Sequence, residues 1–163
     1  MLWVKTFFGI LFQTILLGIF LYLPALTLNW SDAFLLLTIH FLMTILASAY
    51  LLIVKPESIE ARMNYDSKTQ PKEDRLATAL MFSAIFVGLS LAPIDIFHLN
   101  LSSSFEGSIK NIGLAIYIIG MLLFMASINA NEFAETTVNI QEERGQKVID
   151  TGIYSMVRHP MYT

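Results

Sequence analysis

Residues 6–23 read TFFGILFQTILLGIFLYL, and this stretch without a single charge decides the fold. It is long enough to cross the apolar core of a lipid bilayer as a helix. Three more uncharged windows follow, at residues 33–54, 76–94 and 111–131. Because a backbone in lipid must satisfy its own hydrogen bonds, each window is predicted to be helical. We therefore expect an all-α polytopic membrane protein, with four transmembrane helices in one domain over residues 1–163 and the lipid bilayer as its partner.

The composition agrees with this class of protein. Hydrophobic residues make up 55% of the chain and charged residues 14%, with a mean hydropathy of +0.62. Soluble domains carry about a quarter charged residues. The net charge of −3 argues against a nucleic-acid partner. The chain has no cysteine, and its three histidines are too far apart in sequence to suggest a metal site, so no metal is predicted.

The loops between the windows contain turn and helix-start residues. The first window follows a short head ending at Lys5, and no signal-peptide cleavage site follows it, so we expect a retained helix that ends before Pro24. Ser31 or Asp32 is placed to cap the second helix. Pro56 is expected to start a short interfacial helix.

The third and fourth windows predict closely packed helices. Small residues recur every four positions in the third window, and glycines occur in the fourth, a pattern typical of helix contacts in membranes; they are Ala84, Gly88, Ala92, Gly113 and Gly120. Pro93 and Asp95 are expected to end the third helix. The fourth helix is expected to continue beyond the membrane through residues 132–144.

Two polar side chains interrupt the apolar windows. Gln13 and His40 are expected to bond neighbouring helices rather than a substrate, because buried polar groups usually find a partner. An ionisable group at membrane depth is nevertheless a candidate for function. Their roles therefore stay open.

The lysines and arginines predict the orientation. They concentrate in residues 55–75 and after the fourth window, whereas the opposite loops hold only Lys110. By the positive-inside rule both termini are cytoplasmic, and we expect the bacterial inner membrane as the location.

The last residues, 151–163, read TGIYSMVRHPMYT and gather polar side chains beyond the fourth helix. Arg158 offers a planar fork that can hold a carboxylate through two hydrogen bonds. His159 can donate or accept a proton near neutral pH. Pro160 favours the start of a new helix, whose free N–H groups attract anions. A basic patch that holds anionic lipid headgroups is the simpler alternative.

Written T-G-x-Y-x-x-V-R-H-P-M-Y, this segment resembles the motif of the isoprenylcysteine carboxyl methyltransferase family and its bacterial relatives. Asn131, Phe133 and the stretch IQEERGQKV at 140–148 are similar to that family as well. The resemblance implies an integral membrane methyltransferase that uses S-adenosylmethionine as its cofactor. It implies a lipophilic or prenylated acceptor with a carboxylate, thiol or amine. The cofactor-binding residues it implies are Arg158, His159, Pro160, Tyr162 and Tyr154, and it identifies no catalytic residue.

In that family a glycine and further membrane helix follow the motif, whereas this chain stops at Thr163. We therefore expect an incomplete fragment that is inactive by itself.

Two other functions fit the same residues. Sterol reductases, which use NADPH and have more spans, carry a similar arginine-histidine-x-x-tyrosine stretch. A non-enzymatic membrane module could use its terminal basic residues to dock lipid or a partner. Such a module would tolerate Arg158→Lys, because a point charge serves lipid headgroups nearly as well as a fork.

Overall fold

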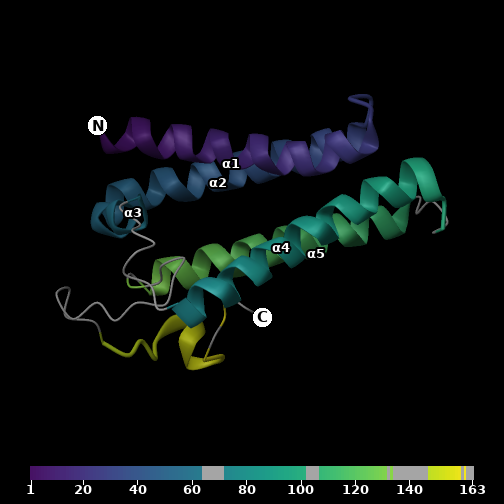
Figure 1. The fold of residues 1–163 in the computed structure, drawn as a ribbon. Coiled ribbons are helices and arrows are strands. Elements are labelled where there is room, and N and C mark those ends of the chain that lie inside the picture. Colours follow the sequence, from purple (N-terminus) through teal and green to yellow (C-terminus); the bar gives the residue numbers. More distant parts are fainter. Residues whose placement is uncertain (64–71, 102–106, 132, 134–146, 159, 161–163) are drawn as a thin grey trace.

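A computed structural model describes residues 1–63, 72–101, 107–131, 133, 147–158 and 160. Within these residues the secondary structure is entirely helical. Figure 1 shows the elements in chain order, which are α1 (Leu2–Ala25), α2 (Ser31–Val54), α3 (Pro56–Met63), α4 (Lys72–Ile94), the π-helical turn η1 (Asp95–Leu99), α5 (Ser108–Ala130) and the 3₁₀ turn η3 (Gly152–Ser155).

The four predicted spans are confirmed. Four of the described helices are long and apolar enough to cross a membrane, at Leu2–Ala25, Ser31–Val54, Arg75–Leu99 and Ser108–Ala130. The predicted short helix at Pro56 is also present as α3. The chain is therefore an all-α integral membrane protein.

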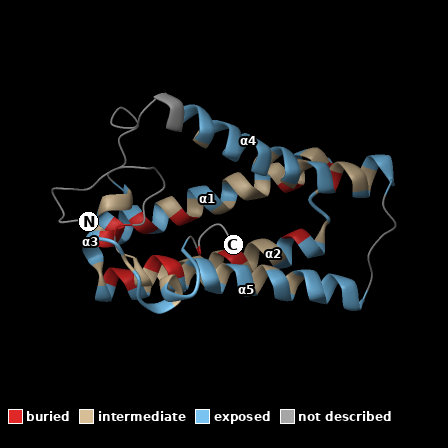
Figure 2. Cartoon of the chain, turned by 90° about the horizontal axis from the view of Figure 1, so that it is seen from below, coloured by how far each residue is buried: buried red, intermediate tan, exposed pale blue. Residues whose placement is uncertain are grey.

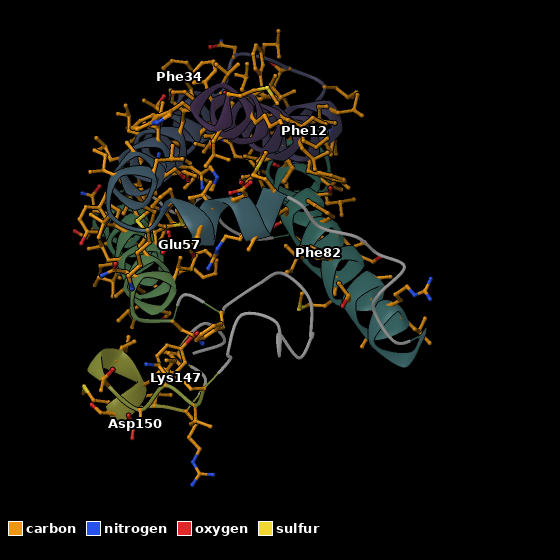
Figure 3. The ribbon with its side chains drawn as sticks, turned by 90° about the vertical axis from the view of Figure 1, so that its left-hand side faces the viewer. Phe12, Phe34, Glu57, Phe82, Lys147 and Asp150 are labelled. Carbon is orange, nitrogen blue, oxygen red and sulfur yellow. The ribbon has the colours of Figure 1, made fainter. Side chains whose placement is uncertain are left out.

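The four spans form an open row rather than a closed bundle. α1 packs against both α2 and α4, and α2 packs in turn against α5. α4 and α5 occupy the two ends of this row, and none of their described Cα atoms approach within 8 Å of each other. Figure 3 shows the row end-on, with α3 crossing in front of the spans.

At one end of the helix axes, which we call the motif end, lie the start of α1, all of α3 and η3 (Figure 1). The buried core of the protein also lies here, as Figure 2 shows. It consists of Leu51, Leu52, Ile59 and Ile128, with Leu2 packed against them. Elsewhere the helices present exposed apolar side chains, such as Phe12, Phe34 and Phe82 in Figure 3. Lipid contact explains these faces, because water is absent at that depth.

The two prolines expected to stop a span lie just inside the ends of their helices. Pro24 lies inside α1, which continues to Ala25. Proline removes the N–H that would bond the carbonyl four residues earlier, here that of Phe20. The Ser90 hydroxyl of α4 donates to that Phe20 carbonyl at 3.4 Å. Pro93 is also inside α4, but α4 ends at Ile94, between Pro93 and Asp95 as predicted. The chain then forms the π turn η1, which Asn100 ends with a φ of 50°.

The cap predicted for α2 and the length predicted for α5 were wrong. α2 begins after Trp30 without any side-chain cap, and the Asp32 carboxylate instead pairs with Lys110 at 2.6 Å. α5 ends at Ala130, because Asn131 is extended with φ −117° and ψ 100°. The predicted continuation through 132–144 is therefore interrupted at its start, and residues 134–146 lie outside the described chain.

The predicted small-residue contacts were also wrong for the described helices. A Cβ atom added at Gly88, Gly113 or Gly120 would meet nothing within 4 Å. These glycines belong to α4 and α5, the outer members of the row, so their small faces have no described neighbour. The close approaches occur instead at Gly9 and Gly18 of α1, one of the two inner helices of the row.

Candidate functional site

The described part of the motif is a compact turn beside the end of α5. Thr151 is extended, and Gly152 then adopts a positive φ of 60°, which reverses the chain into η3. Backbone N–H groups of Tyr154 and Met156 close the turn on the carbonyls of Thr151 and Ile153, at 3.2 and 3.1 Å. In Figure 3 this segment, with Lys147 and Asp150 labelled, lies below α5.

Glycine is required at position 152 for its backbone conformation. Residues with a side chain reach a positive φ only at a cost, because Cβ approaches the following carbonyl. A Cβ atom placed there would also touch the Cβ of Ala130 at 3.6 Å, an ordinary contact distance. The T-G pair of the motif therefore sets the turn directly against the last residue of α5.

Asn131 joins the end of α5 to the motif turn. Its side-chain nitrogen donates to the Tyr154 hydroxyl at 3.4 Å, and its side-chain oxygen accepts the Phe133 N–H at 3.0 Å. Phe133 is 8% exposed. Tyr154, predicted as a cofactor-binding residue, thus has its hydroxyl engaged by the protein itself.

Lys55 fixes the same helix end from the other side. Its ammonium group donates to the Asn129 carbonyl at 2.6 Å, reaching from the end of α2 to the end of α5. The last carbonyls of a helix lack partners within the helix, and a cation there also complements the helix dipole. The end of α5 is therefore held by Lys55, by the Ile128 contact with the core and by Asn131.

The structure describes three of the five predicted cofactor residues. Tyr154 is half-buried, Arg158 is exposed, and Pro160 is buried. Among the described residues Arg158 has no hydrogen-bond or ion-pair partner, so its guanidinium group is available to a ligand. His159 and Tyr162 lie outside the described residues, as does the helix expected to start at Pro160. Their grouping with Arg158 stays a prediction.

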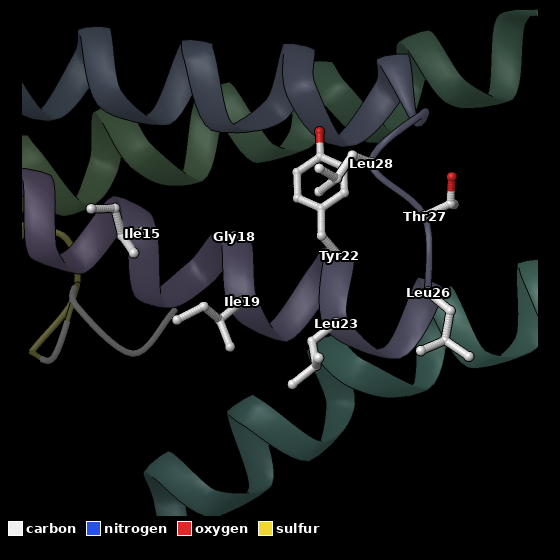
Figure 4. Close-up of a pocket in the computed structure, with 8 residues that line it drawn as sticks. All are labelled: Ile15, Gly18, Ile19, Tyr22, Leu23, Leu26, Thr27 and Leu28. Atoms are coloured by element: carbon white, nitrogen blue, oxygen red, sulfur yellow. The ribbon is translucent and has the colours of Figure 1, made fainter.

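A cavity occurs elsewhere, on the span end opposite the motif (Figure 4). Its volume is about 590 Å³, and it is lined by Ile15, Gly18, Ile19, Tyr22, Leu23, Leu26, Thr27 and Leu28. The Tyr22 hydroxyl already donates to the Trp30 carbonyl at 3.2 Å. An apolar, open surface of this kind suits a lipid chain and offers nothing to hold a charged cofactor. We do not place the functional site here.

No group of three histidine, aspartate or glutamate side chains gathers within the described ranges. The expected lack of a metal site nevertheless stays a prediction, because parts of three connecting stretches and of the motif lie outside those ranges.

Two polar arrangements were missed in the sequence. The Lys55 contact with Asn129 depends on α2 and α5 being neighbours, which the windows do not reveal. Tyr117 of α5 bonds His40 at 2.7 Å, although a membrane tyrosine looked unremarkable beside so many apolar residues. The sequence did offer one indication of the second contact. Gln13, His40 and Tyr117 each lie near the middle of their helices, so their side chains lie at a similar depth in the membrane.

The fold and the motif end together define an integral membrane protein with four spans and a polar turn anchored at one end of them. A family model described as a protein of unknown function, DUF1295, matches residues 37–163, which is most of the chain. The chain belongs to the DUF1295 family. The match begins inside α2, at residue 37, and runs through the whole motif. No curated protein and no solved structure matched the chain.

Proposed function

We propose that this DUF1295 protein is a membrane methyltransferase that binds S-adenosylmethionine at the motif end. The observation that carries the proposal is the anchored turn: Gly152 and Tyr154 tie it to the end of α5, while Arg158 remains exposed. An arginine on an anchored turn suits the recognition of a carboxylate. Its guanidinium group is a planar fork of donors, so little entropy is lost when it binds.

The motif residues divide into two roles under this proposal. Arg158 grips the methionine carboxylate of the donor through two parallel hydrogen bonds, and His159 and Tyr162 line the same pocket by their resemblance to the methyltransferase motif. Tyr154 is a positioning residue, because its hydroxyl is bonded to Asn131. Pro160 is expected to start a helix whose free N–H groups attract the donor.

The reaction needs alignment more than acid or base. When bound, S-adenosylmethionine would supply an activated methyl group, whose transfer to the acceptor nucleophile would leave the electron pair of the broken bond on the donor sulfur. A carboxylate or thiolate acceptor needs no base, whereas an amine must also lose a proton. The protein supplies in-line positioning and excludes water. Because the motif end adjoins exposed apolar helix faces, a lipophilic acceptor can approach from the bilayer.

A reductase is the second candidate, favoured by the same free Arg158, which suits the phosphates of NADPH as well as a carboxylate. The family description names no activity and agrees with either reaction. S-adenosylmethionine carries an amino-acid carboxylate and no phosphate, whereas NADPH carries phosphates and no amino-acid carboxylate. A binding experiment can therefore separate the two proposals.

The test uses the full-length natural protein in lipid nanodiscs, titrated separately with S-adenosylmethionine and NADPH in a calorimeter. We expect saturable binding of S-adenosylmethionine, displaced by S-adenosylhomocysteine, and no binding of NADPH. Binding of NADPH alone would replace the proposal with the reductase. Binding of neither, together with binding to vesicles containing anionic lipid, would make the motif a lipid-docking patch.

A further inference from the structure

The side chain of Asn131, at the end of α5, has two hydrogen-bond partners. Its Oδ1 accepts the backbone N–H of Phe133 at 3.0 Å. Its Nδ2 lies 3.4 Å from the hydroxyl oxygen of Tyr154 in the motif turn. The Asn131 backbone N–H bonds the Ser127 carbonyl at 3.0 Å, so the residue is itself tied to the last turn of the helix. The carboxamide is therefore fixed to α5 while it contacts the motif.

The Phe133 contact determines the orientation of the Asn131 amide. A backbone N–H can only donate, so the side-chain atom that faces it must be the oxygen. The reversed amide would place two donors 3.0 Å apart. The amide nitrogen therefore faces Tyr154, and this nitrogen can only donate. It follows that the Tyr154 oxygen accepts, and that the Tyr154 hydroxyl proton takes no part in the bond.

The Tyr154 hydroxyl proton has no acceptor among the residues that the structure describes. Tyr22, at the opposite end of the spans, shows the contrasting case, because its hydroxyl donates to the Trp30 carbonyl at 3.2 Å. Tyr154 is only half-buried, and Arg158 in the same segment is exposed. Asn131 thus leaves the motif turn with a hydroxyl donor that the internal bonds of the described protein do not use.

A hydroxyl donor complements an arginine in the recognition of a carboxylate. A carboxylate has about four acceptor positions, and a bidentate guanidinium group fills two of them. Gly152 sets the turn that carries Tyr154 against the end of α5, so the hydroxyl is held in place before a ligand binds. A donor held in this way loses little entropy on binding.

We propose that Asn131 is a positioning residue of the donor site, which makes Tyr154 a hydrogen-bond donor to the carboxylate of S-adenosylmethionine. This role rests on the proposed function, and it adds a ligand contact to the positioning role of Tyr154. Asn131 acts only through Tyr154, by occupying the hydroxyl oxygen and leaving the proton to the ligand. Asn131→Asp reverses the bond, because a carboxylate can only accept and Tyr154 must then donate to it.

The direction of the bond can be measured without a ligand, on the full-length protein in nanodiscs. The intensity ratio of the tyrosine Raman doublet is higher for a hydroxyl oxygen that accepts than for a hydroxyl that only donates. The difference between each protein and its Tyr154→Phe variant isolates the Tyr154 signal, and Tyr22→Phe isolates that of Tyr22, the matched donor. We expect a higher ratio for Tyr154 than for Tyr22, and a fall to the Tyr22 value in Asn131→Asp. Equal ratios in the wild type would overturn the inference.

Calorimetry with S-adenosylmethionine tests the role in binding. Tyr154→Phe should weaken binding about tenfold, because a hydrogen bond to a charged group is lost. Asn131→Asp should weaken it at least as much while the helical content stays that of the wild type, because the carboxylate can accept from both partners. Tyr22→Phe should leave the affinity unchanged. Unchanged binding by Tyr154→Phe would overturn the inference.

The double variant separates the diverted proton from the added charge. With Tyr154→Phe already in place, Asn131→Asp should weaken binding further by at most about twofold, because it acts through the missing hydroxyl. An equal loss in both backgrounds would mean that the new charge repels the ligand, and would overturn the inference. A wild type that does not bind S-adenosylmethionine would overturn the proposed function and this role together. A wild type that binds it while any other result fails would overturn this role alone.

Discussion

Replacing Lys55 with methionine tests whether the end of α5 is held from α2. Methionine keeps most of the apolar stem and removes the ammonium group that donates to the Asn129 carbonyl at 2.6 Å. A hydrogen bond to a charged group contributes about 1.5–3 kcal/mol, and the charge also complements the helix dipole. Since Lys55 is half-buried rather than enclosed, we expect a loss of about 2 kcal/mol in the free energy of unfolding.

The matched control is Lys110→Met at the opposite end of the spans. Lys110 makes an ion pair of the same 2.6 Å length with the Asp32 carboxylate. The Lys110 side chain is 44% exposed and the Asp32 side chain is 50% exposed. Exposed ion pairs are screened by water and contribute about 0–1 kcal/mol. Unfolding by sodium dodecyl sulfate in mixed micelles, followed by circular dichroism, measures both variants. A control that loses as much stability as Lys55→Met would refute the reasoning.

Three further outcomes follow from the described geometry. Gly88→Leu should leave stability within about 0.5 kcal/mol in the same titration, because its Cβ meets nothing, and a clear loss would show that this face is packed. Gly152→Ala should cost about 1–2 kcal/mol through its positive φ, whereas an unchanged unfolding curve would mean that the turn relaxes freely. Cysteines placed at Glu60 and Leu101 should react with impermeant reagents from opposite sides of the membrane, the Glu60 side being cytoplasmic, and labelling from one side would contradict the four-span topology.

The helices could be predicted from the sequence, whereas several of their ends could not. Uncharged windows are a property of one segment, and lipid permits few structures other than a helix for them. At the end of α1, the Phe20 carbonyl that Pro24 leaves without its N–H accepts a hydrogen bond from Ser90 of another helix. A local rule for proline cannot include a donor that lies seventy residues away in the chain.

The order of the helices in the row explains the other differences between the predicted and the observed contacts. A glycine face is useful only where a neighbour covers it, and Gly88 and Gly120 lie on the outer helices of the row. The contacts of His40 with Gln13 and Tyr117, which confirm that Gln13 and His40 bond neighbouring helices, likewise require α2 to touch both α1 and α5. The resemblance of the motif rests on contiguous residues, whereas the bond between Tyr154 and Asn131 joins positions on either side of a long connecting stretch.

The central claim is that Arg158 binds the carboxylate of S-adenosylmethionine, and calorimetry on the full-length protein and its variants tests it most directly. A bidentate, charge-assisted contact of about 1.5–3 kcal/mol corresponds to about ten- to a hundredfold in affinity. Arg158→Ala should therefore lose that factor, and Arg158→Lys should lose most of it because lysine lacks the fork. Lys147→Ala, which removes an exposed charge from the same segment, should keep wild-type affinity. Equal affinities for wild type, Arg158→Ala and Arg158→Lys would contradict the claim.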